Sequence, residues 1–164
     1  TLSLERYEAL TDLGFAKFED IATNDPDLSA LRDCGGKLLL TQAVNDQVVP
    51  YDSVVDYYRR VVVTCGGAAQ TGSFARLFCT DGDIHGTIAG PGPGLTTASA
   101  MTALMAWVEQ GEAPEEIIAE RVDVTTGQVV AARPTYPYPT VTRYKGSGDP
   151  AAASSYVASL KSCR

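Results

Sequence analysis

The chain has 164 residues, of which 45% are hydrophobic and 20% are charged, as is ordinary for one globular domain with a sizeable core. Its formal net charge of −7 argues against a nucleic-acid partner, because a nucleic-acid-binding surface needs a basic patch. No apolar run approaches the roughly 18 to 20 residues that span a bilayer, so we expect no membrane partner either.

A helix is predicted at the start of the chain, over residues 2–18. Four apolar side chains recur there three residues apart, which places them on one helical face: Leu4, Tyr7, Leu10 and Leu13. A second helix is predicted over residues 96–114, where Gly111 and Pro114 end the helical pattern. We expect its core face to carry Met101, Leu104, Trp107 and Val108.

The middle of the chain alternates between strand and helix patterns. Residues 37–43 and 74–80 are short apolar runs with the length of buried strands, and residues 50–63 between them have helical spacing. Together with the helix at 96–114, this order predicts parallel strands joined by crossover helices, and therefore an α/β fold. Two such strands are too few for a free-standing doubly wound sheet, so the predicted core is truncated.

The last third of the chain has weaker patterns. Residues 117–134 predict a hairpin that turns at Thr126 and Gly127. Residues 135–164 are punctuated by Pro and Gly, and we predict coil there, with room for a short terminal helix. Tyr136 and Tyr138 stand between prolines, where surface packing is the first interpretation and a pocket wall the second.

Two loops follow the predicted parallel strands, and each holds one side chain suited to acid–base chemistry. Asp46 follows the first strand, and His85, the only histidine, follows the second. The carboxyl ends of parallel strands meet at one edge of a sheet, so the two loops are expected to be neighbours. Asp46 can then accept the Nδ1 proton of His85 and stabilise the imidazolium, which makes the two an acid–base pair without a nucleophile.

Other interpretations of the histidine loop stay open at this point. His85 could be a surface residue bonded to Asp81 or Asp83, or the three could hold a divalent metal, since they are spaced two apart. No G-x-S-x-G nucleophile elbow occurs in the chain. Ser147 completes a linear Asp–His–Ser order, but no predicted strand precedes it.

Several segments together resemble one enzyme family. They read "DPDLSALRDCGGKLLL", "NDQVVP", "DYYRRV", "FARLF", "GDIHG", "GPGPG", "MAWVEQGEAPEEIIA" and "RPTYPYPTVTRYKGSGD", in that order. Their order and spacing are similar to those of the tannase and feruloyl esterase family, over roughly Asp25 to Asp149. The resemblance implies that residues 1–164 form the C-terminal portion of one α/β-hydrolase catalytic domain, with parallel strands and crossover helices followed by a hairpin and coil, and with no second domain.

The resemblance also implies a function and a location. Members of the family are secreted or periplasmic serine esterases that cleave esters of aromatic acids such as ferulate or gallate. Asp46 and His85 match the Asp and His of the family's triad. The serine, its oxyanion hole and a calcium-binding lid are then expected upstream of Thr1. The expected partners are therefore an N-terminal part of the same enzyme, on a separate chain or a missing segment, and an aromatic ester substrate. No cofactor is expected in this chain.

The chain departs from the family pattern at its cysteines. Gly86 stands where the family has a Cys directly after the histidine, and Tyr136 stands where it has another. The four cysteines of this chain, Cys34, Cys65, Cys79 and Cys163, could be free thiols or form disulfides, and a Cys65–Cys79 bridge is the leading expectation. The missing nucleophilic serine and the missing Cys after His85 support an alternative function, a non-catalytic binding or structural module that keeps the hydrolase scaffold.

Overall fold

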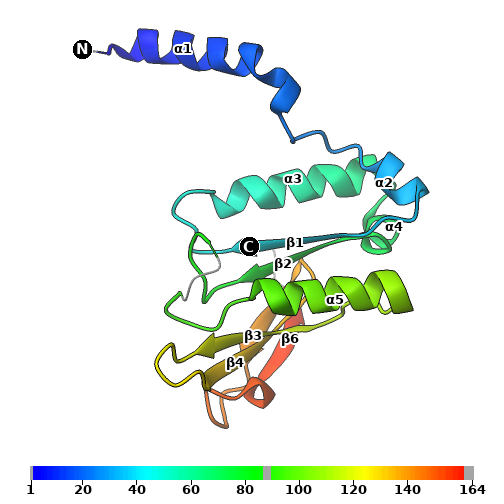
Figure 1. Cartoon of the computed structure of the whole chain (residues 1–164), viewed down its shortest axis with the longest axis vertical. Coiled ribbons are helices and arrows are strands. Elements are labelled where there is room, and N and C mark those ends of the chain that lie inside the picture. The colour runs from blue at the N-terminus through cyan, green and yellow to red at the C-terminus, as the bar shows by residue number, and fades with distance from the viewer. Residues whose placement is uncertain (1, 87–89, 161–164) are drawn as a thin grey trace.

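A parallel pair of strands, β1 and β2, lies at the centre of the computed structural model, which describes residues 2–86 and 90–160 (Figure 1). The elements, in chain order, are α1 (Leu4–Lys17), the 3₁₀ helix η1 (Glu19–Ile21), α2 (Ser29–Asp33), β1 (Leu38–Ala43), α3 (Tyr51–Thr64), α4 (Ala68–Gly72), β2 (Ala75–Thr80), α5 (Thr97–Gln110), β3 (Ile117–Val122), β4 (Val129–Thr135), β5 (Thr140–Tyr144), the 3₁₀ helix η2 (Ala153–Ser155) and β6 (Tyr156–Leu160).

The two central strands pair in register from Leu38 opposite Ala75 to Ala43 opposite Thr80. α3 and α4 form the crossover between them, and α3 and α5 lie on opposite faces of the pair (Figure 1). The predicted order of strand, helix, strand and helix is therefore confirmed, and the fold is α/β as expected. α3 continues through its three successive valines to Thr64, although β-branched residues weaken helices.

Side chains of β2 alternate between the two faces, which is why both helices find an apolar surface to cover. Leu77 packs against Val55 and Tyr58 of α3. The next residue, Phe78, packs in a separate cluster with Leu95 and Ile117, against which Ala103 of α5 also rests. Leu77 and Phe78 are both fully buried. The core therefore lies on both faces of two short strands.

The predicted hairpin is present as β3 and β4. The Asp123 carboxylate accepts hydrogen bonds from the N–H groups of Thr125 and Thr126 at 2.8 and 2.9 Å, and Gly127 has a φ of 70°. These contacts and the left-handed glycine explain why the chain turns at this point, as the sequence predicts.

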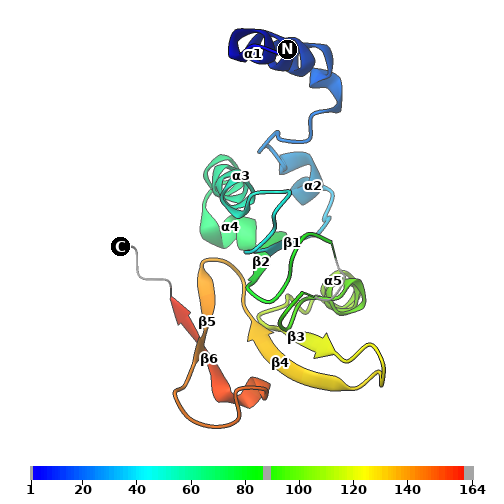
Figure 2. The ribbon, with the colours of Figure 1, turned by 90° about the vertical axis from the view of Figure 1, so that its left-hand side faces the viewer.

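The C-terminal part corrects one prediction, because coil was expected over residues 135–164. The described part instead contains a second hairpin, in which β5 and β6 pair antiparallel from Thr140 opposite Leu160 to Tyr144 opposite Tyr156. The two hairpins lie together on one side of the central pair (Figure 2). Each strand of the second hairpin has five residues, and the pairing connects segments twelve or more residues apart, so the local sequence signal was weak. The described end of the chain forms β6 rather than the short terminal helix, and residues 161–164 lie outside the described residues.

Two helices expose apolar side chains that the sequence pattern would bury. α1 forms as predicted but extends away from the rest of the chain in both views, and none of its residues is buried (Figures 1 and 2). On α5, Trp107 is buried, but Met101 and Val108 are 48% and 61% exposed, so placing them in the core was wrong. The reason is that α5 covers a sheet of only two strands, which is too narrow to bury more of the helix. No helix in the described part of the chain is both long and apolar enough to cross a membrane.

The cysteines correct another prediction. Cys65 follows the last turn of α3 and is 1% exposed, packed with Val61 and Phe74 as a free thiol. The expected Cys65–Cys79 bridge is therefore wrong. The two side chains belong to different clusters, since Cys79 packs beside Leu77 near the far end of β2. Cys34 is an exposed free thiol, and Cys163 lies outside the described residues.

A matched pair of substitutions tests where the core lies. Phe78→Ala removes a ring that is 0% exposed and should lower the free energy of unfolding by about 3–5 kcal/mol. Phe15→Ala removes a ring that is 74% exposed on α1 and should change it by less than about 1 kcal/mol. Urea denaturation followed by tryptophan fluorescence measures both values, and equal losses would contradict this core assignment.

Candidate active site

The loops that follow β1 and β2 emerge at the same edge of the parallel pair and bring Asp46 and His85 together. His85 Nδ1 lies 3.0 Å from Asp46 Oδ2 and 3.1 Å from Oδ1. The Asp46 side chain is 8% exposed, whereas the imidazole is 46% exposed. An ionised carboxylate can only accept hydrogen bonds, so this contact requires the proton of a neutral imidazole to be on Nδ1. The second ring nitrogen, Nε2, has no hydrogen-bond partner among the described residues.

The carboxylate of Asp46 is held by its own loop. Its Oδ1 accepts hydrogen bonds from the backbone N–H groups of Val48 and Val49, both at 2.8 Å. Partial burial opposes ionisation, but the hydrogen bonds from Val49, Val48 and His85 outweigh it, so the pKa of Asp46 lies below its ordinary value. Asp46 is therefore a fixed and ionised acceptor for the imidazole.

A buried side-chain amide also holds this loop. Gln42 on β1 is 8% exposed, and its Nε2 donates to the carbonyl oxygens of Ala43 and Val49, at 3.0 and 3.1 Å. These two carbonyls stand at the start and the end of the turn that carries Asp46. Gln42 thus fixes the width of the turn, a role that no motif in the sequence indicated.

Asp83 fixes the start of the histidine loop. Its Oδ2 accepts hydrogen bonds from Thr80 Oγ1 at 2.9 Å and from the Leu95 N–H at 3.0 Å. A Cβ on Gly94 would overlap the Asp83 carboxylate, and a Cβ on Gly82 would overlap the backbone at Pro93. The "GPGPG" segment therefore packs directly against the histidine loop, and its described glycines permit the close approach.

The structure does not support a metal site formed by Asp81, Asp83 and His85, because each of the three has a different partner. Asp81 pairs with Arg133 at 3.1 Å, Asp83 accepts the two bonds described above, and His85 contacts Asp46. No group of three or more His, Cys, Asp or Glu side chains suited to a metal ion occurs within residues 2–86 and 90–160. The structure also pairs His85 with Asp46 rather than with Asp81 or Asp83. Ser147 lies in the turn between β5 and β6 and makes no hydrogen bond with His85.

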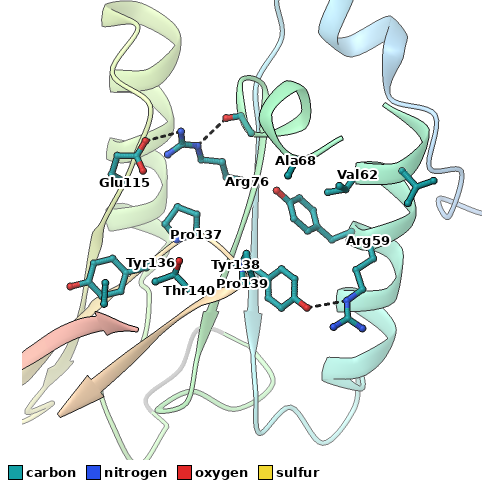
Figure 3. A pocket seen from close by; sticks show the side chains of 14 residues that line it. Arg59, Val62, Ala68, Arg76, Glu115, Tyr136, Pro137, Tyr138, Pro139 and Thr140 are labelled. Atoms are coloured by element: carbon teal, nitrogen blue, oxygen red, sulfur yellow. Dashed lines mark hydrogen bonds and ion pairs between the residues drawn. The ribbon is translucent and has the colours of Figure 1, made fainter. Parts of the chain in front are cut away.

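One large pocket is remote from the Asp–His pair. It has a volume of about 820 Å³ and lies beside Arg76, at the start of β2, whereas His85 follows the end of that strand. Figure 3 shows the ion pair of Arg76 with Glu115 on one side of this pocket and the contact of Arg59 with Tyr138 on the other. Tyr136 and Tyr138 line it, so these two rings are pocket walls as well as packing groups. A smaller hollow of about 140 Å³ adjoins Asp46 and Gly86.

Comparisons with known proteins agree on one family. The sequence model described as "Tannase and feruloyl esterase" matches residues 1–159, which extends the resemblance beyond Asp25 to Asp149. A mono(2-hydroxyethyl) terephthalate hydrolase from Piscinibacter sakaiensis is 42% identical over 124 residues, which are 75% of this chain and 20% of that protein. A probable feruloyl esterase from Arthroderma benhamiae is 35% identical over 141 residues, which are 85% of this chain and 26% of that protein.

The fold of the chain is also similar to that of a solved esterase structure. The chain superimposes on feruloyl esterase B from Aspergillus oryzae with a TM-score of 0.77 and 26% sequence identity. The match covers 85% of this chain and 30% of the esterase. The chain thus spans less than a third of the length of each of these three relatives.

The contacts of Asp46 predict a pH dependence of stability. Its pKa is below 3.8 in the folded chain and about 3.8 when unfolded, so its ionised form stabilises the fold above pH 3.8. That contribution is lost as the pH falls through the folded pKa. The difference in free energy of unfolding between wild type and Asp46→Asn should therefore be largest above pH 3.8 and shrink below it. Urea titrations across this range measure the difference, and Asp20→Asn serves as an exposed control. A difference that grows on acidification would contradict the assignment.

Proposed function

Because this chain belongs to the tannase and feruloyl esterase family, we propose that it supplies the Asp and His of a serine esterase triad. The observation that carries the proposal is the contact of His85 Nδ1 with the anchored carboxylate of Asp46 at 3.0 Å. The nucleophilic serine then comes from polypeptide outside these 164 residues, either on the same chain or on a partner.

The geometry of the pair fits general base catalysis. With its Nδ1 proton bonded to Asp46, neutral His85 has its basic lone pair on Nε2, and the ring is half exposed. A serine hydroxyl is hardly ionised near neutral pH and needs such a base to become a nucleophile. Asp46 holds the required tautomer and stabilises the imidazolium that forms, without taking the proton itself.

The proposed reaction has two halves. The serine oxygen attacks the ester carbonyl carbon while His85 takes the hydroxyl proton, and the imidazolium then returns that proton to the departing alcohol. This leaves an acyl-enzyme, in which the acid is esterified to the serine. Water then attacks the acyl carbon with His85 again as base, and collapse of the intermediate releases the carboxylic acid and restores the serine.

The proposed substrates are esters of aromatic acids, of the feruloyl or galloyl type. Family membership supports this class, as do the names of the similar proteins from Arthroderma benhamiae and Aspergillus oryzae. The secreted or periplasmic location and the calcium-binding lid are proposals that rest on family membership alone. In this proposal the lid belongs to polypeptide outside these 164 residues.

The complete protein, including the segment or partner that supplies the serine, should hydrolyse methyl ferulate or methyl gallate. Asp46→Asn and His85→Ala should each lower kcat by about 10³-fold or more, because each removes part of the general base. Steady-state release of the aromatic acid, followed by its ultraviolet absorbance, measures the loss. Asp52→Asn, an exposed carboxylate on α3, is the matched control and should leave kcat unchanged.

Two outcomes would contradict the proposal. Residues 1–164 alone should not react with a fluorophosphonate probe, so stoichiometric labelling of a serine in this chain would overturn the assignment of an external nucleophile. A complete protein that binds such esters but does not cleave them would instead favour a non-catalytic module on the same scaffold.

A further inference from the structure

Three consecutive side chains in the loop that follows β1 (the β1 loop) all form hydrogen bonds with the loop that follows β2 (the β2 loop, which carries His85). Asn45 Nδ2 donates to the carbonyl oxygen of Asp81 at 2.7 Å. Asp46 accepts from the His85 ring at 3.0 Å, and Gln47 Oε1 accepts from the His85 backbone N–H at 3.3 Å. The segment "NDQ" thus contacts both the first residue of the histidine loop and the histidine itself.

The contacts of Asp46 and Gln47 restrain different parts of His85. The carboxylate of Asp46 holds one ring nitrogen, which still leaves the backbone of the histidine free to shift. Gln47 holds the backbone N–H of that residue, so two neighbouring side chains fix both its main chain and its ring. Because Gln47 follows Asp46 directly, any displacement of His85 relative to the carboxylate stretches at least one of the two hydrogen bonds.

The histidine loop itself provides little restraint next to His85. Gly86, the residue that follows, has a φ of 81°, and glycine has more backbone freedom than any other residue. The imidazole is 46% exposed, so packing does not enclose it. Its position must therefore come largely from hydrogen bonds made to the neighbouring loop.

Asn45 connects this arrangement to the rest of the fold. The carbonyl that it contacts belongs to Asp81, whose carboxylate pairs with Arg133 of β4 at 3.1 Å. The Arg133 guanidinium in turn stacks over the Tyr156 ring of β6, 5.3 Å from its centroid. The start of the histidine loop is thereby tied to the β1 loop on one side and to both hairpins on the other.

We propose that Asn45 and Gln47 are positioning residues that hold His85 in register with Asp46. In this proposal Gln47 acts through the His85 N–H, and Asn45 acts through the carbonyl oxygen of Asp81 in the same loop. Their effect on catalysis rests on the proposed esterase function, whereas their effect on the imidazole does not depend on it. Two separate measurements therefore distinguish failure of this proposal from failure of the proposed function.

The first measurement is made on the 164-residue chain by nitrogen NMR. His85 is its only histidine, so ¹⁵N-labelled histidine reports on this one imidazole without overlap. In the wild type, the shifts of the neutral ring should show the proton mainly on Nδ1. Asn45→Ala and Gln47→Ala should each move at least about a third of the population to the Nε2-protonated form, which hydrogen bonding to Asp46 disfavours.

Matched variants keep this measurement specific. Gln47→Glu retains an acceptor oxygen for the His85 N–H and should restore most of the Nδ1-protonated form. Asn24→Ala and Gln128→Ala remove exposed amides elsewhere on the chain and should leave the spectrum unchanged. All the substituted amides are exposed, so circular dichroism should show the same fold in every variant. An unchanged tautomer in both Asn45→Ala and Gln47→Ala overturns the positioning role.

The second measurement is made on the complete protein with methyl ferulate. Each alanine variant should lower kcat by about 5- to 10-fold, the effect of one net hydrogen bond, while KM stays within about twofold. A rise in KM with unchanged kcat would overturn the proposal, because it would indicate contact with the substrate. If the tautomer shifts as expected but the wild-type protein cleaves no ester, the positioning role stands and the proposed function fails.

Discussion

The candidate site exists because β1 and β2 pair in parallel. With Ala43 opposite Thr80, both strands end at the same level, and their loops must leave the sheet side by side. An antiparallel pairing would place the same two loops at opposite edges. The contact of His85 with Asp46 is therefore a consequence of strand direction, and strand direction follows from the crossover through α3.

This pairing brings the two loops together, but hydrogen bonds decide where the reactive atoms lie. The turn after β1 is closed by Gln42 and by the Val48 and Val49 amides, so the carboxylate is preorganised before it meets the imidazole. The start of the loop after β2 is held by hydrogen bonds to Asp83. Preorganised polar groups need little rearrangement during a reaction, which is how such a pair can contribute to catalysis.

The elements with strong local patterns were predictable from sequence. α3 and α5, the two central strands and the β3–β4 turn at Gly127 all follow from spacing, length or turn residues. The β5–β6 hairpin was missed because its stability comes from pairing between distant segments. The exposure of Met101 was also missed, and the expected Cys65–Cys79 bridge was wrong although free thiols had stayed open, since periodicity and cysteine counts carry no information about which neighbours are present.

The residues capable of acid–base chemistry can be identified from the amino-acid sequence. It contains one histidine, and Asp46 and His85 each follow a predicted parallel strand, so their proximity could be expected. The contacts that hold them become visible only in the folded chain. Asn45 and Gln47 flank Asp46 in the "NDQVVP" segment, but that segment does not reveal their partners, which are backbone atoms of a loop some 36 to 38 residues away in the chain. Contacts between side chains and distant backbone groups leave no periodic trace in a sequence, because any suitable donor or acceptor can make them.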